Sequence, residues 1–145
     1  MKEIQNPMVD LVKAKELCKQ FSRVLNSHVI LMNSVAPMVT SNGVLLSKDA
    51  QAAAQRELNK KGMLVVISDD GETPENVTKL QDNKVYEGEK ILFNPNSMVA
   101  FTTTITTEEL LDGLTLPDSI PVREEMYKKY VILCMHKSNI ACTIK

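Results

Sequence analysis

Apolar residues near the start of the chain recur at every third or fourth position. The stripe consists of Leu11, Ala14, Cys18, Phe21 and Leu25. This spacing predicts an amphipathic helix over residues 6–25, with Asn6 as its N-cap and Pro7 in its first turn. Residues 1–25 are therefore expected to form an N-terminal helical extension. Its apolar stripe is expected to pack on its own domain, and the alternative is a helix used between subunits.

After Asn26 the pattern changes to short, β-branched apolar runs, which are typical of strands. The predicted strands are residues 29–32, residues 63–67, residues 91–93, a segment in which Val99, Phe101, Thr103 and Ile105 alternate, and a terminal hairpin made of residues 130–135 and 140–144. Six short strands favour a small β-barrel or sandwich. The predicted fold is mainly β with helical additions.

Three long connections separate these strands. The first, residues 33–61, ends in an Ala- and Gln-rich tract at 49–60 that is compatible with a helix. The second, residues 68–84, contains the turn-forming Asp-Asp-Gly and Thr-Pro sequences. In the third connection, residues 106–129, the spacing of Thr106 and Glu109 resembles a capping box, and Gly113 is placed to end a short helix. A second short helical segment is expected over residues 121–129.

The first connection also contains an isolated apolar sequence, Gly43-Val44-Leu45-Leu46. Polar loop residues precede it and the helix-compatible tract follows it. Two interpretations are open at this point. The aliphatic residues either belong to the protein's own core, as a buried edge strand, or form a contact surface for another protein.

Composition excludes several classes of function. The formal net charge is −1, so no electrostatic footprint for nucleic acid or an anionic membrane is present. Aromatic residues make up 4% of the chain and Trp is absent, which argues against a stacking surface for bases or sugars. No run approaches the roughly 18–20 apolar residues of a membrane span, and charges occur throughout residues 1–20. We expect a cytoplasmic protein with reduced cysteines.

Candidate chemistry is sparse. A zinc site from Cys134, His136 and Cys142 would need the terminal hairpin to bring them together, and no fourth ligand is evident. The five glycines are isolated, so no phosphate-binding loop is present, and no nucleophile lies in a recognisable elbow. We therefore expect no catalytic residues, no metal, no cofactor and no enzymatic activity.

The order of strands and loops resembles that of GroES-type co-chaperonins, most closely the divergent versions of tailed bacteriophages. Residues 25–32 resemble the first barrel strand of that family, and Gly43 to Leu46 match the Gly followed by three aliphatics of its mobile loop. Residues 62–67 resemble the strand after that loop. Residues 85–93 resemble the family's Val-x-x-Gly-Asp-x-x-x-Phe pattern, with Glu89 in place of Asp. The sequence from residue 129 to 144 is especially similar to the viral proteins.

The resemblance implies a GroES-like β-barrel over residues 26–145, with a mobile loop at 33–61 and a roof-like loop at 68–84. Residues 1–24 have no counterpart in the family, and residues 102–129 are an insertion before the terminal hairpin. The segment from Gly43 to Gly62 is longer than usual. These differences are expected to change the ring or its dome rather than the basic contact.

The resemblance also implies a function. Family members form a seven-fold ring that caps a GroEL-type chaperonin in its nucleotide-bound state and encloses the chamber in which a client protein folds. In this interpretation Val44, Leu45 and Leu46 bind an apolar groove of the chaperonin, and Gly43 permits the turn that presents them. The client could be a viral capsid protein, and the compartment would then be the host cytoplasm. The alternatives are a small β-barrel binding or virion module without chaperone activity, and a small enzyme on a barrel scaffold.

Overall fold

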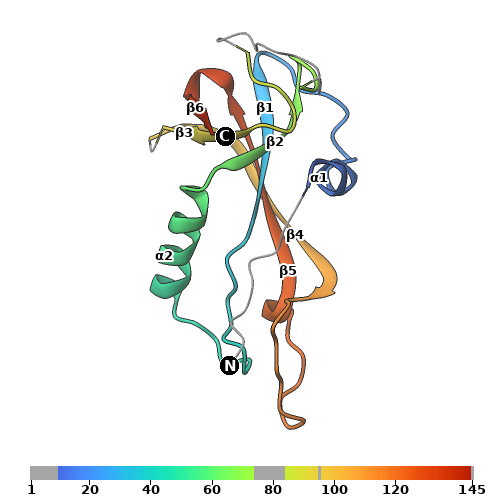
Figure 1. The fold of residues 1–145 in the computed structure, drawn as a ribbon, viewed down its shortest axis with the longest axis vertical. Helices are drawn as coiled ribbons and strands as arrows, with labels where there is room; N and C mark the ends of the chain where they lie inside the picture. The colour runs from blue at the N-terminus through green and yellow to red at the C-terminus, as the bar shows by residue number, and fades with distance from the viewer. Residues whose placement is uncertain (1–9, 74–83, 95, 145) are drawn as a thin grey trace.

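The structure is a computed structural model that describes residues 10–73, 84–94 and 96–144. Its strands are β1 (His28–Ser34), β2 (Met63–Ser68), β3 (Lys90–Phe93), β4 (Val99–Leu110), β5 (Tyr127–His136) and β6 (Ile140–Ile144). They form one six-stranded antiparallel sheet in the order β4-β5-β1-β2-β3-β6 (Figure 1). Two helices, α1 (Leu11–Leu17) and α2 (Lys48–Asn59), accompany it. The prediction of a mainly β fold with helical additions is confirmed.

The strand order has two ends, so the sheet is not closed. β4 and β6 occupy these ends, and each is paired along one side. Closure into a barrel stays a prediction and is taken up with the proposed function.

Both faces of the central strands are buried. Ile30 and Met32 of β1 pack in one apolar cluster with α1, whereas Val29 and Leu31 pack in a second cluster on the opposite face. The same alternation holds along β2 and β5. Continuous apolar runs are expected for strands that are covered on both sides, which explains why these strands lack a polar face.

The N-terminal helix is shorter than predicted. α1 begins after Asp10, whose side chain accepts a hydrogen bond from the Lys13 amide at 2.8 Å, and it ends at Leu17. The prediction of helix over residues 18–25 is wrong, and residues 6–9 lie outside the described residues. Beyond the helix the chain runs across the sheet, and Phe21 stacks on Phe101 of β4 with ring centroids 5.5 Å apart. Of the predicted stripe, Ala14 and Cys18 are buried, Leu11 and Phe21 are half-buried, and Leu25 is exposed.

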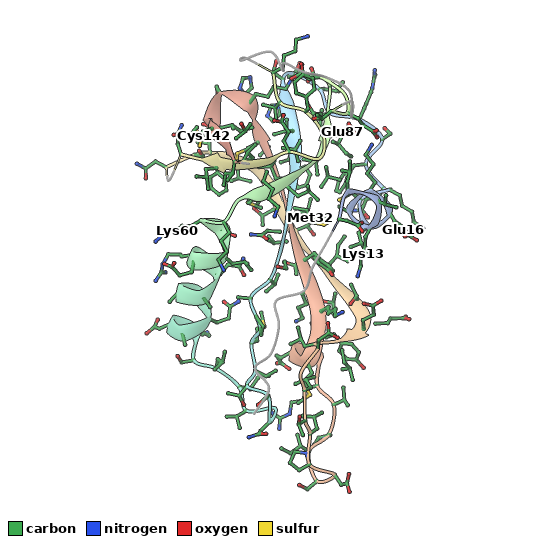
Figure 2. All side chains as sticks on the ribbon, in the orientation of Figure 1. Lys13, Glu16, Met32, Lys60, Glu87 and Cys142 are labelled. Atoms are coloured by element: carbon green, nitrogen blue, oxygen red, sulfur yellow. The ribbon has the colours of Figure 1, made fainter. Side chains whose placement is uncertain are left out.

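Lys13 links α1 to the long strands. Figure 2 shows Lys13 at α1. Its Nζ lies 5.6 Å from the centroid of the Tyr130 ring and 3.5 Å from Oε2 of Glu109. Burial alone would lower the pKa of Lys13, but interactions with Tyr130 and Glu109 outweigh it and raise that pKa. The helix is therefore held to the sheet by charge as well as by apolar contact.

The insertion before the last strands is mainly not helical. β4 continues to Leu110, so the helix predicted from Thr106 is wrong. A bulge near its end lets the Thr107 hydroxyl donate to the Lys128 carbonyl at 2.9 Å and accept from the Glu109 amide at 3.2 Å. The second predicted segment, residues 121–129, contains one short 3-10 turn at Glu124–Met126, and β5 begins at Tyr127.

The predicted terminal hairpin is wrong in its pairing, although both strands exist. β5 pairs with β1 and β4, whereas β6 pairs with β3. The 3-10 turn Lys137–Asn139 directs the chain away from β5. Most of the predicted roof-like loop, residues 74–83, lies outside the described residues, and the Asp69-Asp70 turn that opens it is present.

Helix α2 confirms the helix-compatible tract, and it is attached by polar contacts. None of its residues is buried. The side chains of Gln51, Gln55 and Asn59 are four residues apart, and they face the end of β1 and the residues that follow it. Gln55 accepts from the Ala36 amide at 2.7 Å and donates to the Ser34 carbonyl at 3.1 Å. The Gln55 side chain therefore forms the backbone hydrogen bonds that a neighbouring strand would otherwise form with this segment.

Candidate protein-binding hairpin

The apolar sequence predicted as a contact surface forms one arm of a small hairpin over residues 38–46, called the hairpin below. The Leu46 amide donates to the Met38 carbonyl at 2.8 Å, and the Thr40 amide donates to the Val44 carbonyl at 2.8 Å. A β-bridge joins Val39 to Leu45. The first connection therefore consists of this hairpin followed by α2, and its mobility stays a prediction.

The turn of the hairpin depends on Gly43. Its amide donates to the Thr40 carbonyl at 2.9 Å, and its φ is +84°. A turn followed by a left-handed residue is a common three-residue hairpin connection, and glycine adopts this backbone at least cost. A Cβ at position 43 would lie 2.7 Å from Cδ2 of Leu116 and 3.1 Å from Cε of Met126. Gly43 is thus required both by the turn and by the residues packed against it.

The two arms of the hairpin differ in exposure. Val39 is 2% exposed, whereas Val44, Leu45 and Leu46 are 61%, 47% and 38% exposed. The hypothesis that these residues are a buried edge strand is therefore wrong for the single chain. Three adjacent aliphatic side chains in solvent form a small apolar surface suited to contact with another protein.

The buried side of the hairpin rests on a loop between β4 and β5. This supporting loop, residues 111–126, contributes the buried Leu111 and Met126 to a cluster with Val39. Leu114, Leu116 and Ile120 pack around that cluster. The Thr115 amide also donates to the Ser41 carbonyl at 2.7 Å. Both segments leave the sheet at the same end in Figure 1.

This hairpin was not predicted, although the sequence carries a local signal for it. Asn-Gly between apolar residues is a strong hairpin signal, and Asn42-Gly43 stands between Val39 and Val44. The contact with residues 111–126 has no comparable signal, because about 70 residues separate the two segments.

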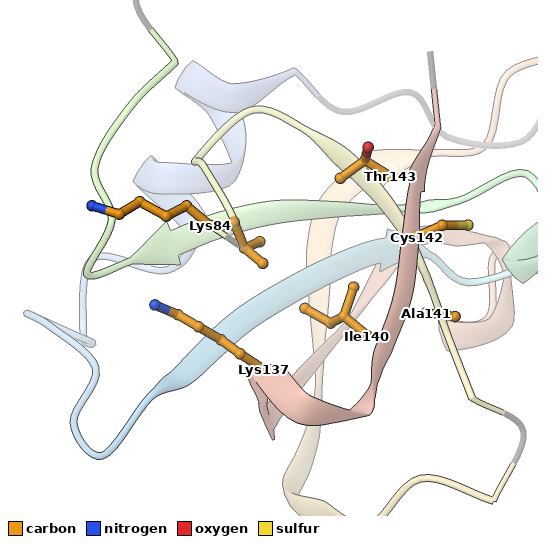
Figure 3. A pocket seen from close by; sticks show the side chains of 7 residues that line it. Lys84, Lys137, Ile140, Ala141, Cys142 and Thr143 are labelled. Atoms are coloured by element: carbon orange, nitrogen blue, oxygen red, sulfur yellow. The ribbon is translucent and has the colours of Figure 1, made fainter. Parts of the chain in front are cut away.

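A hollow of about 400 Å³ lies along β6 (Figure 3). It is lined by Lys84, Val85, Lys137 and residues 140–143. Lys137 is not available as a free cation, because its ammonium pairs with Asp69 and Asp70. The remaining lining combines the Lys84 side chain with residues 140–143 of β6, an edge strand of the sheet.

The structure does not assemble the zinc ligands considered above. Cys134 is buried in the cluster under α1, whereas Cys142 is exposed on β6. His136 contacts His28, with ring centroids 5.4 Å apart. Within the described ranges, no three His, Cys, Asp or Glu side chains are grouped as metal ligands. No helix in the described part of the chain is both long and apolar enough to cross a membrane.

Comparisons with protein-family models, with curated proteins and with solved structures find no match to this chain.

Proposed function

We propose that this chain is a co-chaperonin that caps a GroEL-type chaperonin in its nucleotide-bound state. The observation that carries the proposal is the exposure of Val44, Leu45 and Leu46 on a hairpin at one end of the sheet. The sequence resemblance described above identifies this segment with the chaperonin-binding loop of that family. The partner supplies ATP hydrolysis, and this chain supplies no catalytic residue or cofactor.

A single hairpin is expected to bind weakly. Fully burying an aliphatic side chain contributes roughly 1.5–3 kcal/mol. Because these three side chains are on average about half exposed, the remaining gain is about 2–4 kcal/mol per hairpin. The translational and rotational freedom lost on association costs at least that much. Useful affinity therefore requires several hairpins on one assembly, which raises the effective concentration of each after the first one binds.

The proposal includes a ring of identical subunits, with seven as the number in the resembling family. The outer edges of β4 and β6 pair with no other strand in the described part of the chain, and they support such contacts because unpaired strand edges favour pairing with another chain. The same proposal includes completion of a GroES-like barrel, enclosure of a folding client such as a viral capsid protein, and a cytoplasmic location.

The test is electron microscopy of the protein mixed with a GroEL-type chaperonin and ATP. Capped particles are expected with the wild-type chain, and caps should be lost with Leu45→Asp or Leu46→Asp. Val12→Asp is the matched control, because Val12 is 79% exposed on α1, away from the hairpin. The proposal is overturned if wild-type protein forms no caps, or if the Asp variants still cap the chaperonin and support client refolding.

A further inference from the structure

The supporting loop contacts one side of the hairpin only. It covers Val39 and Gly43, and it leaves Val44, Leu45 and Leu46 in solvent. A loop that masked the apolar segment would bury those three side chains instead. The observed contact fixes the backbone of the hairpin and keeps its apolar surface available.

The contact is close enough to restrict the hairpin. No room for even one methyl group remains between Gly43 and Leu116. A hydrogen bond from Thr115 to Ser41 holds the turn from the same side. Met126, which is fully buried, packs in the apolar cluster beneath this turn. Side-chain packing and a backbone hydrogen bond therefore act on the same three-residue turn.

We propose that residues 111–126 are a preorganising support that holds the hairpin in its binding shape before a partner is met. This inference rests on the proposed function for the identity of the partner. If a binding-competent shape is populated only a fraction of the time, the apparent affinity falls by that fraction. The support keeps the fraction near one, so partner binding does not have to order the hairpin. In this respect the proposal departs from the mobile loop at 33–61 that the resemblance implies.

The test compares two substitutions in the same loop. Leu116→Asp places a charge against Gly43, whereas Val122→Asp changes a side chain that is already 50% exposed. Hydrogen exchange is followed at the amides of Thr40, Gly43 and Leu46, which donate the hydrogen bonds of the hairpin. Leu116→Asp should accelerate this exchange by about tenfold or more, and Val122→Asp should leave it unchanged. Leu116→Ala is a milder variant for use if Leu116→Asp perturbs exchange in β1 and β2.

Binding to a GroEL-type chaperonin with nucleotide is measured with the same variants. A hairpin ordered one tenth of the time should bind about tenfold more weakly per site. The proposal is overturned if amide hydrogen exchange in the hairpin is unchanged in both Leu116 variants. Faster exchange with tighter binding also overturns it, because the loop would then be inhibitory. If the wild-type protein does not bind the chaperonin, the proposed function is refuted, and so is the gain in affinity for that partner. Hydrogen exchange, measured without any partner, still decides whether the supporting loop orders the hairpin.

Discussion

Lys137 and Asp70 form an ion pair in which Nζ lies 2.8 Å from Oδ2, and both side chains are mostly buried. The same carboxylate oxygen accepts from the Val85 amide at 2.9 Å, and the Lys137 amide donates to the Ser27 carbonyl at 2.8 Å. The pair therefore joins the turn before β1, the turn after β2, the segment before β3 and the turn after β5. Burial alone would raise the pKa of Asp70, but Lys137 and Val85 outweigh it and lower that pKa.

Asp70 should make the fold acid-sensitive. A carboxyl whose pKa is lowered by folding binds more protons in the unfolded chain, so its stabilising contribution is complete above the ordinary value of 3.8. That contribution is lost as the pH falls through the folded pKa. In urea unfolding at pH 7, Asp70→Asn should cost about 1–3 kcal/mol, and the difference from wild type should shrink toward pH 2.5. The exposed Asp118→Asn is the control; an equal loss in that variant, or a constant difference across pH, contradicts the role of Asp70.

Gln55 should be the main attachment of α2. Replacing it with Ala leaves the Ala36 amide and the Ser34 carbonyl without their side-chain partner. A loss of about 1–3 kcal/mol in the free energy of unfolding is expected, because both groups are shielded from water. Glu57→Ala is the matched control on the same helix. Its pair with Lys60 is exposed, so its removal should change stability by less than about 0.5 kcal/mol. Equal effects would show that α2 is not held through Gln55.

The strands that sequence predicted best are those with apolar residues on both faces. β1 and β2 are recognisable because each face meets its own cluster, so nearly every residue is apolar. The end of β4 was mispredicted because Thr106, Glu109 and Gly113 satisfy local rules for a helix. In the structure, pairing of the Thr-rich segment with β5 overrides those rules.

The remaining errors concern contacts between distant segments. Neighbouring strands in sequence usually pair, so residues 130–144 were predicted as a hairpin. The turn at Lys137–Asn139 is held instead by Ser27 and the Asp69-Asp70 turn, and β6 pairs with β3. For the candidate site, sequence identified Val44 to Leu46 as an apolar segment. No local pattern encodes the packing of residues 111–126 against Val39 and Gly43.

The thiol of Cys18 should be unreactive in the folded protein. Cys18, the C-cap residue of α1, is 1% exposed, and burial raises its pKa to about 11 from an ordinary 9.0. Below pH 9 the thiolate fraction is therefore about a hundredfold lower than for a free thiol. At pH 8, iodoacetamide should modify the exposed Cys142 first, and Cys18 should react only after urea is added, as followed by peptide mass spectrometry. Similar rates at the two cysteines in the folded protein would contradict the buried position of Cys18.

Gly43→Ala should destabilise the hairpin for two separable reasons. The positive φ of +84° costs an L-residue roughly 1–2 kcal/mol. The added Cβ would also lie 2.7 Å from Cδ2 of Leu116, so one of the two must move. Gly71→Ala isolates the first term, because Gly71 has φ of +92° and no atom of the described residues lies within 4 Å of its Cβ position.

A double-mutant cycle with Leu116→Ala measures the second term. Removing Cδ2 relieves the closest contact of the added Cβ and leaves the 3.1 Å contact with Cε of Met126, so Gly43→Ala should cost less in the Leu116→Ala background than in the wild type. The coupling free energy between the two positions is expected at about 0.5–3 kcal/mol, as for residues in direct contact. It is read from urea unfolding and from exchange at the Leu46 amide. Additive costs would mean that Gly43 is required by its backbone alone, and that Leu116 does not press on the turn.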